Sequence, residues 1–155
     1  GMGAAGRDVW VVDLWRLDCS IREILGLVRV VAGEESAITL ASRIEESLAI
    51  VMRARGKDIP VYGPIWRRPW MTLTEDTYAH HVLAAAGARN VFADQEGRYP
   101  ERGPDEAIEA GARAVLLPTE PYPFHEKIDA ARDKLVEAGF PSDRIHLVDG
   151  EALTW

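Results

Sequence analysis

The stretch RAVLLPTEPYPFHEKIDAARDKLVEAGFPSDRIHLV, residues 113–148, decides the fold. It opens with RAVLLP (113–118), a continuous apolar run that is typical of a strand buried on both faces of a sheet. A helix is predicted over residues 124–138, ending at Gly139, and RIHLV (144–148) is predicted as the next strand. Strand, helix and strand in this order predict a parallel pair joined by a right-handed crossover.

The same alternation precedes this stretch. IPVYGPI (59–65) is predicted as a strand, and Thr74-Glu75-Asp76 is predicted to cap a helix that runs to Gly87, with an acidic first turn that suits the helix dipole. We therefore predict an α/β fold, a parallel-sheet sandwich lobe with helices on both faces. In such sheets ligands bind beyond the carboxyl ends of the strands.

The amino-terminal third has a different pattern. VWVVDLW (9–15) is predicted as a strand, and SIRE (20–23) has the capping-box arrangement that starts a helix ending at Gly33. A second, long helix is predicted at about residues 35–55, ended by Gly56, because apolar residues recur there every three or four positions. The lobe is thus preceded by a strand and a long backbone helix.

Composition limits the function classes. The chain has 155 residues, a net charge of -7 and a pI of about 5.1, which argues against nucleic-acid binding because phosphate neutralisation needs a basic face. One cysteine excludes an internal disulfide. The start, Gly1-Met2-Gly3, lacks the basic and apolar regions of a secretory signal peptide, so the chain as written is expected to stay in the cytoplasm.

Three loops carry the candidate binding residues. The first and second follow the 59–65 and 113–118 strands, and the third covers residues 94–100. Aromatic rings on such loops offer contact area to a large planar ligand at low entropy cost. An alternative is that the rings only cover the ends of the core. The candidates are Trp66, Arg67, Arg68, Trp70, Tyr99, Glu120, Tyr122 and Phe124.

The sequence contains no phosphate-binding loop, dinucleotide-binding turn or nucleophile elbow, and we predict that the protein is not an enzyme. No cofactor or metal is expected. Adjacent helical residues such as His80 and His81 point about 100° apart and cannot chelate one ion together. Cys19 is expected to be an inert thiol, while His125 is a candidate for ligand contact.

Three runs carry a family resemblance: PVYGPIWRRPWMTLTEDTYAHHVLAAAGARNVFADQEGRYPE (60–101), AVLLPTEPYPF (114–124) and IHLVDGEALTW (145–155). With these three runs, the chain resembles the vitamin B12 and iron-siderophore periplasmic-binding domain. This domain is the substrate-binding component of ABC importers whose two lobes are joined by one long helix. Proteins of this kind work outside the cytoplasmic membrane, so the localisation of this chain stays open.

The resemblance implies an organisation and a set of roles. Residues 1–56 would hold a residual strand of the amino-terminal lobe, a connecting helix and the backbone helix. Residues 57–155 would form the carboxyl-terminal ligand-binding lobe, with cobalamin or a ferric siderophore bound by the loop residues named above. Asp105 and Glu106 would dock onto an ABC permease, although Gly103-Pro104-Asp105 departs from the usual serine-led turn.

The resemblance covers only one lobe and leaves a second function open. Apolar stripes on residues 20–55 would need a cover, and a two-fold homodimer is one solution. The alternative to a single-lobe substrate-binding protein is a remnant outside transport, acting as a structural or regulatory homodimer or as a partner-binding module.

Overall fold

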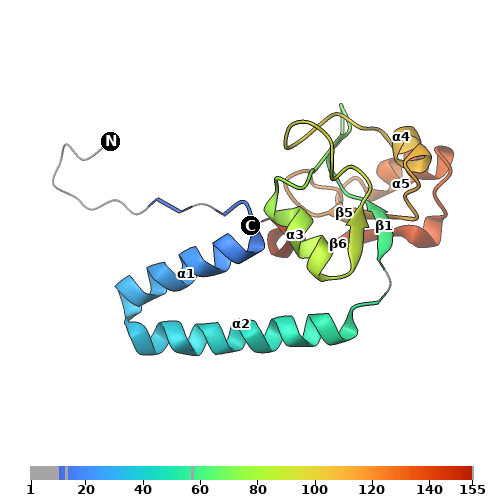
Figure 1. Cartoon of the computed structure of the whole chain (residues 1–155). Coiled ribbons are helices and arrows are strands. Elements are labelled where there is room, and N and C mark those ends of the chain that lie inside the picture. Colours follow the sequence, from blue (N-terminus) through green and yellow to red (C-terminus); the bar gives the residue numbers. More distant parts are fainter. Residues whose placement is uncertain (1–10, 13, 57, 155) are drawn as a thin grey trace, which may run out of the picture. The chain divides into compact units, whose positions relative to one another are not determined.

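The computed structural model describes residues 11, 12, 14–56 and 58–154 (Figure 1). Contacts divide the chain into two compact units, Gly1–Ala49 and Ile50–Trp155, which we describe separately. The predicted division between residues 56 and 57 remains a prediction. No helix in the described part of the chain is both long and apolar enough to span a bilayer.

The first unit contains helix α1 (Leu17–Ala32) and most of helix α2 (Glu34–Ala54), which continues into the second unit. Gly33 separates the two helices with a φ of 87°, a backbone conformation that favours glycine, as predicted. The predicted capping box at residues 20–23 is wrong. The backbone N–H of Ser20 already donates to the Arg16 carbonyl at 2.8 Å, so the helix has begun before Ser20.

The strand predicted at residues 9–15 is a second correction. Residues 11, 12 and 14 are in no strand, while residues 9, 10 and 13 lie outside the described part of the chain. A strand is stabilised by backbone hydrogen bonds to a neighbour, and no described strand pairs with these residues.

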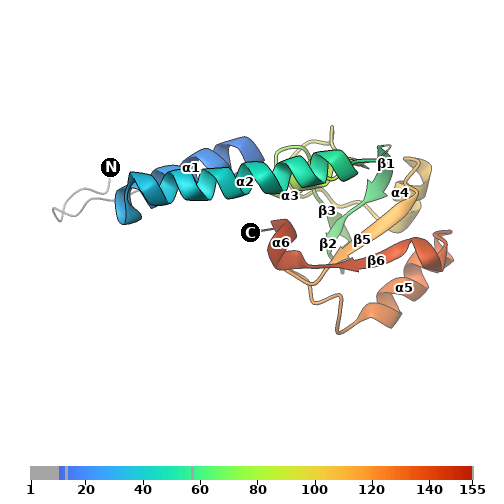
Figure 2. The ribbon, with the colours of Figure 1, turned by 90° about the horizontal axis from the view of Figure 1, so that it is seen from below.

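The second unit is built on a four-stranded sheet of β1 (Ile59–Tyr62), β4 (Ala88–Asn90), β5 (Ala114–Pro118) and β6 (Ile145–Val148). The strand order is β4-β1-β5-β6 and every pair is parallel, which confirms the predicted fold class; Figure 2 shows β1, β5 and β6 side by side. The predicted strand at 59–65 is interrupted at Gly63. Beyond it, β2 (Pro64–Trp66) pairs antiparallel with β3 (Met71–Thr72).

Helices cover both faces of the sheet, and β5 shows this by alternation. Val115 and Leu117 belong to a core that includes Leu135 of α5 (Ile128–Glu137). The intervening Leu116 packs on the opposite core, which includes Leu83 of α3 (Tyr78–Ala85). Helix α4 (Pro104–Glu109) contributes a buried side chain to the core that contains Leu135. Helix α6 (Gly150–Thr154) contributes one to the core that contains Leu83.

Two helix starts differ from prediction. Thr77, not Thr74, caps α3, because its Oγ1 accepts from the backbone N–H of His80 at 3.3 Å. The Thr74 hydroxyl instead donates to the Gly97 carbonyl at 2.8 Å. The Thr74 side chain therefore binds the loop that contains Gly97 and does not cap α3. Helix α5 begins at Ile128 rather than at 124, since turns precede it, and it ends before Gly139 as predicted.

Candidate ligand-binding site

An aromatic cluster lies beyond the carboxyl ends of β1 and β5. Its members, Trp66, Trp70, Tyr122 and Phe124, come from the first and second predicted loops. Trp66 meets Tyr122 edge-on at 5.3 Å between ring centroids, and Tyr122 lies 4.6 Å from Phe124. Phe124 stacks on Trp70 at 6.1 Å, so four rings form one continuous series.

Burial divides the aromatic cluster into an inner and an outer part. Phe124 is 0% exposed and Tyr122 is also buried, and both belong to the core that Tyr62 and Leu117 share. Trp70 is half-buried and packs against this core, while Trp66 is 41% exposed. The inner rings cover the end of the core, and Trp66 is the ring with the most surface left for a ligand.

Backbone hydrogen bonds join the first loop to the third. Thr72 and Thr74 donate their backbone N–H groups to the carbonyls of Pro100 and Arg98, at 3.0 and 3.1 Å. In return the N–H of Arg102 donates to the Trp70 carbonyl at 3.1 Å. Two predicted loops that are distant in sequence are therefore held against each other, which fixes the backbone that carries Trp70.

Arg67 is a largely buried cation beside the aromatic cluster. Its residue is 9% exposed, and its guanidinium lies 5.7 Å from the centroid of the Trp70 ring. No acidic side chain of the described chain forms an ion pair with it. A cation over an aromatic face, largely withdrawn from water and without an acidic partner, is suited to hold an anionic or electron-rich group.

The remaining predicted binding residues lie at the outer surface. Arg68 is exposed and has a φ of 74°, a strained conformation for a residue with a side chain. Glu120 and Tyr99 are exposed too. Within the described part of the chain, Tyr99 makes no ring contact with the aromatic cluster.

Sequence reasoning missed one neighbour of the cluster, Lys127. Its ammonium lies 5.1 Å from the centroid of the Tyr122 ring. The two residues meet because the chain turns between Phe124 and α5, where the N–H of Lys127 donates to the Phe124 carbonyl at 3.2 Å. A basic residue five positions from a tyrosine carries no sequence signal for this contact.

Tyr62 connects the aromatic cluster to the core of the sheet. Its ring lies 6.5 Å from that of Trp70, and its hydroxyl donates to the Arg102 carbonyl at 2.7 Å. Burial, followed by the negative charge of Glu106, raises the pKa of the Tyr62 hydroxyl well above its usual range. The hydroxyl is therefore protonated at neutral pH, as its hydrogen bond to the Arg102 carbonyl requires.

Asp105 and Glu106, the predicted permease-docking residues, differ in their contacts. Asp105 and Glu106 are both exposed, at the start of α4. The Glu106 carboxylate accepts from the backbone N–H of Gly103 at 2.6 Å and lies 3.5 Å from the guanidinium of Arg102. The Glu106 carboxylate therefore caps the start of α4. Of the two carboxylates, that of Asp105 is the one better placed for a partner.

His80 and His81 are adjacent residues of α3. Their rings meet edge-on at 5.3 Å, and burial, together with the nearby His81, lowers the pKa of His80. In the described part of the chain, no group of three or more His, Cys, Asp or Glu is placed to hold a metal ion. Cys19 is a partly buried free thiol in α1, and His125 is exposed beside Phe124.

No protein-family model matches the sequence, and no curated protein matches it. Solved structures do match the fold. The periplasmic heme-binding protein HutB of Vibrio cholerae superposes with a TM-score of 0.80 at 20% identity, over 97% of this chain and 62% of that one. The periplasmic vitamin B12 binding protein BtuF of Vibrio cholerae gives 0.71 at 17% identity, over 96% and 58%.

An ABC transporter substrate-binding protein from Listeria monocytogenes gives a TM-score of 0.75 at 18% identity, over 97% of this chain and 63% of that one. This chain thus spans about three-fifths of the length of these proteins. The fold implied by the resemblance is confirmed, because solved structures that match it are periplasmic binding proteins, among them those described as binding vitamin B12 and heme.

Proposed function

We propose that this protein is a binding protein related to the receptors of ABC importers, and that it holds a flat ligand of the cobalamin or ferric-chelate class against the aromatic cluster. One observation carries the proposal. Trp66 keeps an exposed face at the carboxyl edge of the sheet, and it contacts the buried ring of Tyr122, which itself packs on Phe124. A rigid aromatic surface of this kind binds planar ligands with little loss of side-chain entropy.

Polar groups around Trp66 would orient the ligand. Arg67 offers a guanidinium without an acidic partner in the described chain, and Arg68 and Glu120 are exposed at the same edge. We assign Arg67 to an acidic or carbonyl group on the ligand rim. Binding would be noncovalent, and no residue is assigned a catalytic role.

Calorimetric titration with cyanocobalamin and, separately, with heme tests this function. Saturable heat with either ligand is expected for the unaltered protein, and Trp66→Ala should abolish it. Trp15→Ala is the matched control, because Trp15 lies in the first unit. The proposal would be contradicted if the Trp66→Ala variant still bound either ligand. It would also be contradicted if the folded, unaltered protein bound neither cyanocobalamin nor heme.

A second function is favoured by the first unit. Its helices expose several large apolar side chains, among them Val30 and Val31 of α1 and Ile38 of α2. Large apolar side chains left exposed on both helices make this unit a candidate interaction surface. The alternative proposal is a structural or regulatory homodimer, in which these side chains meet their copies across a two-fold axis.

A further inference from the structure

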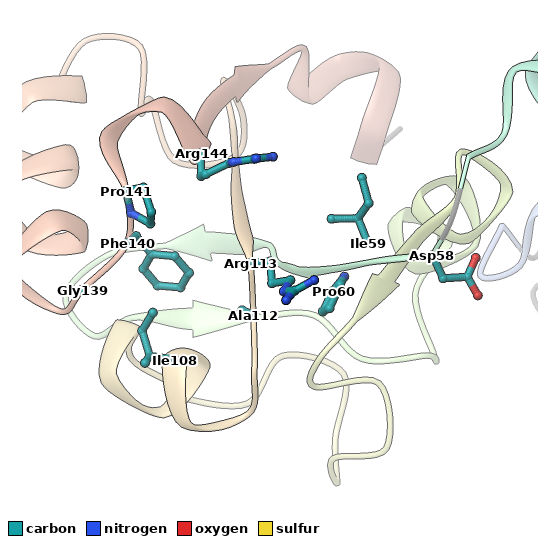
Figure 3. Close-up of a pocket in the computed structure, with 10 residues that line it drawn as sticks. All are labelled: Asp58, Ile59, Pro60, Ile108, Ala112, Arg113, Gly139, Phe140, Pro141 and Arg144. Atoms are coloured by element: carbon teal, nitrogen blue, oxygen red, sulfur yellow. The ribbon is translucent and has the colours of Figure 1, made fainter.

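A hollow of about 600 Å³ lies at the edge of the sheet opposite the aromatic cluster (Figure 3). Ile59 is the first residue of β1, while Arg113 and Arg144 directly precede β5 and β6. Because these strands are parallel, their amino-terminal ends share one edge. The volume is within the range of small-molecule sites, roughly 300–1,000 Å³.

The charge in this hollow is unbalanced. Neither Arg113 nor Arg144 has a side-chain hydrogen bond or ion pair within the described part of the chain. Asp58, the acidic residue of the lining, already accepts from Arg55 at 2.9 Å. Figure 3 shows both arginine side chains extending from the residues just before β5 and β6 toward Ile59 and Pro60. Two like charges that line one hollow in a protein of net charge -7 favour an anion there.

The rest of the lining is apolar. Ile59 and Ile108 are 48% and 36% exposed, and each has apolar surface that a ligand could cover. Phe140 is buried and stacks on Tyr62 with ring centroids 6.4 Å apart, which ties the lining to the core. A ligand that suits this hollow has an apolar body as well as a negative charge.

Backbone hydrogen bonds hold the main chain at Arg113 and at Arg144. The N–H of Arg113 donates to the Pro60 carbonyl at 2.8 Å, and the N–H of Arg144 donates to the Pro141 carbonyl at 2.9 Å. Pro60 and Pro141 themselves belong to the lining. The backbone of both arginines is therefore fixed, so that their side chains start from defined positions at the hollow.

We propose that this hollow is a second binding site, which takes a small carboxylate with an apolar body. Arg113 and Arg144 hold the carboxylate, because a guanidinium presents a planar set of donors that matches it. The apolar body covers Ile59, Ile108 and the edge of Phe140. The site uses none of the residues assigned to the aromatic cluster and does not depend on the function proposed there.

Titration of the full chain with octanoate, followed by amide chemical shifts, tests the proposal. Saturable shifts are expected at the backbone amides of residues 58, 59, 108, 113, 139, 140 and 142–144. Octylammonium, which has the same chain with the opposite charge, should not bind, and inorganic phosphate should bind more weakly because it lacks the apolar body. Equal binding of phosphate would overturn the assignment to a carboxylate with an apolar body.

Variants separate the two parts of the site. Arg113→Met with Arg144→Met should raise the octanoate Kd by about tenfold or more, as expected when charge-assisted hydrogen bonds are lost. Arg89→Met is the matched control, since Arg89 is an exposed arginine on β4. Ile108→Glu should also weaken binding, because it places a charged side chain against the apolar body of the ligand. An unchanged Kd in the double arginine variant, or octanoate shifts confined to other residues, would overturn the proposal.

Discussion

Trp66 and Trp70 have the same side chain and are expected to respond differently to truncation. Trp66 is partly exposed and contacts Tyr122 edge-on, so Trp66→Ala should lower the free energy of unfolding by only about 1 kcal/mol. Trp70 packs on Phe124 and Tyr62, so Trp70→Ala should cost about 3 kcal/mol or more. Urea denaturation of the two single variants measures both values.

This contrast limits what a double variant can show. Loss of ligand binding in a Trp66 and Trp70 double variant would mix a lost contact with a damaged core. Trp66→Ala alone is therefore the informative variant for function. A loss of stability with Trp66→Ala as large as that with Trp70→Ala would mean that both rings only cover the core.

Tyr62 predicts a specific loss of stability in alkaline solution. Its pKa is raised in the folded state, chiefly by burial, so the unfolded chain releases this proton first, near its ordinary value of about 10. The unfolded state then binds fewer protons than the folded state, and the free energy of unfolding falls as pH rises above that value. Below it the contribution is fully present.

Tyr62→Phe should make this alkaline fall shallower, although the variant also loses the hydrogen bond to the Arg102 carbonyl. Tyr99→Phe is the control, because Tyr99 is exposed and should leave the slope unchanged. Denaturant titrations at several pH values on either side of 10 provide the measurement. Equal slopes for Tyr62→Phe and the unaltered protein would refute the assignment.

At the scale of elements, α6 and the Glu120 loop are built around Gly150. A Cβ at this position would lie 2.3 Å from the backbone nitrogen of Glu120, so any side chain must displace that loop. The N–H of Gly150 also donates to the Thr119 hydroxyl at 2.9 Å. Gly150→Ala should lower the melting temperature and shift the amide resonances of residues 119, 120 and 122.

Gly56→Ala is the matched control, since a Cβ there has no neighbour within 4 Å. Thermal unfolding and amide spectra of the two variants should therefore differ clearly. If both variants behave like the unaltered protein, the close approach of α6 to the loop is not as described.

The elements also show how far the sequence could predict the structure. The buried strand β5 and the ends of α1 and α5 were predictable, because a continuous apolar run and a glycine after each helix carry their own signals. The starts of α1 and α3 were not. Ser20 and Thr74 have capping chemistry, but the helix had already begun in one case and a loop carbonyl bound the hydroxyl in the other.

The candidate site was predictable in part for the same reason. The strand ends placed Trp66, Trp70, Tyr122 and Phe124 at one edge, which the structure confirms as a cluster. The division between buried and exposed rings depends on the joining of residues 70–74 to 98–102, a contact between segments without a shared pattern. The contacts of Arg67 with Trp70 and of Lys127 with Tyr122 could not be foreseen either, because neither spacing carries a sequence signal.

For the whole molecule, the homodimer remains a prediction that mass can test. Light scattering at micromolar concentration should give about twice the mass of one chain if the apolar side chains of the first unit pair. Val30→Glu with Val31→Glu should return the mass to that of a monomer, because both side chains are exposed and a charge there opposes association. Leu147→Glu is the control, an exposed apolar residue in the second unit. A monomeric mass for the unaltered protein would count against this function.

The strand order has a consequence for synthesis of the chain. β1 leaves the ribosome before every other strand of the sheet, yet in the finished sheet it lies between β4 and β5. Its two hydrogen-bonding edges thus have no partner until residues 88–90 and 114–118 have been made. During that interval the nascent chain carries an unpaired central strand, a state that exposes it to association with other chains. Translation speed across residues 63–118 should therefore influence how much protein is recovered folded.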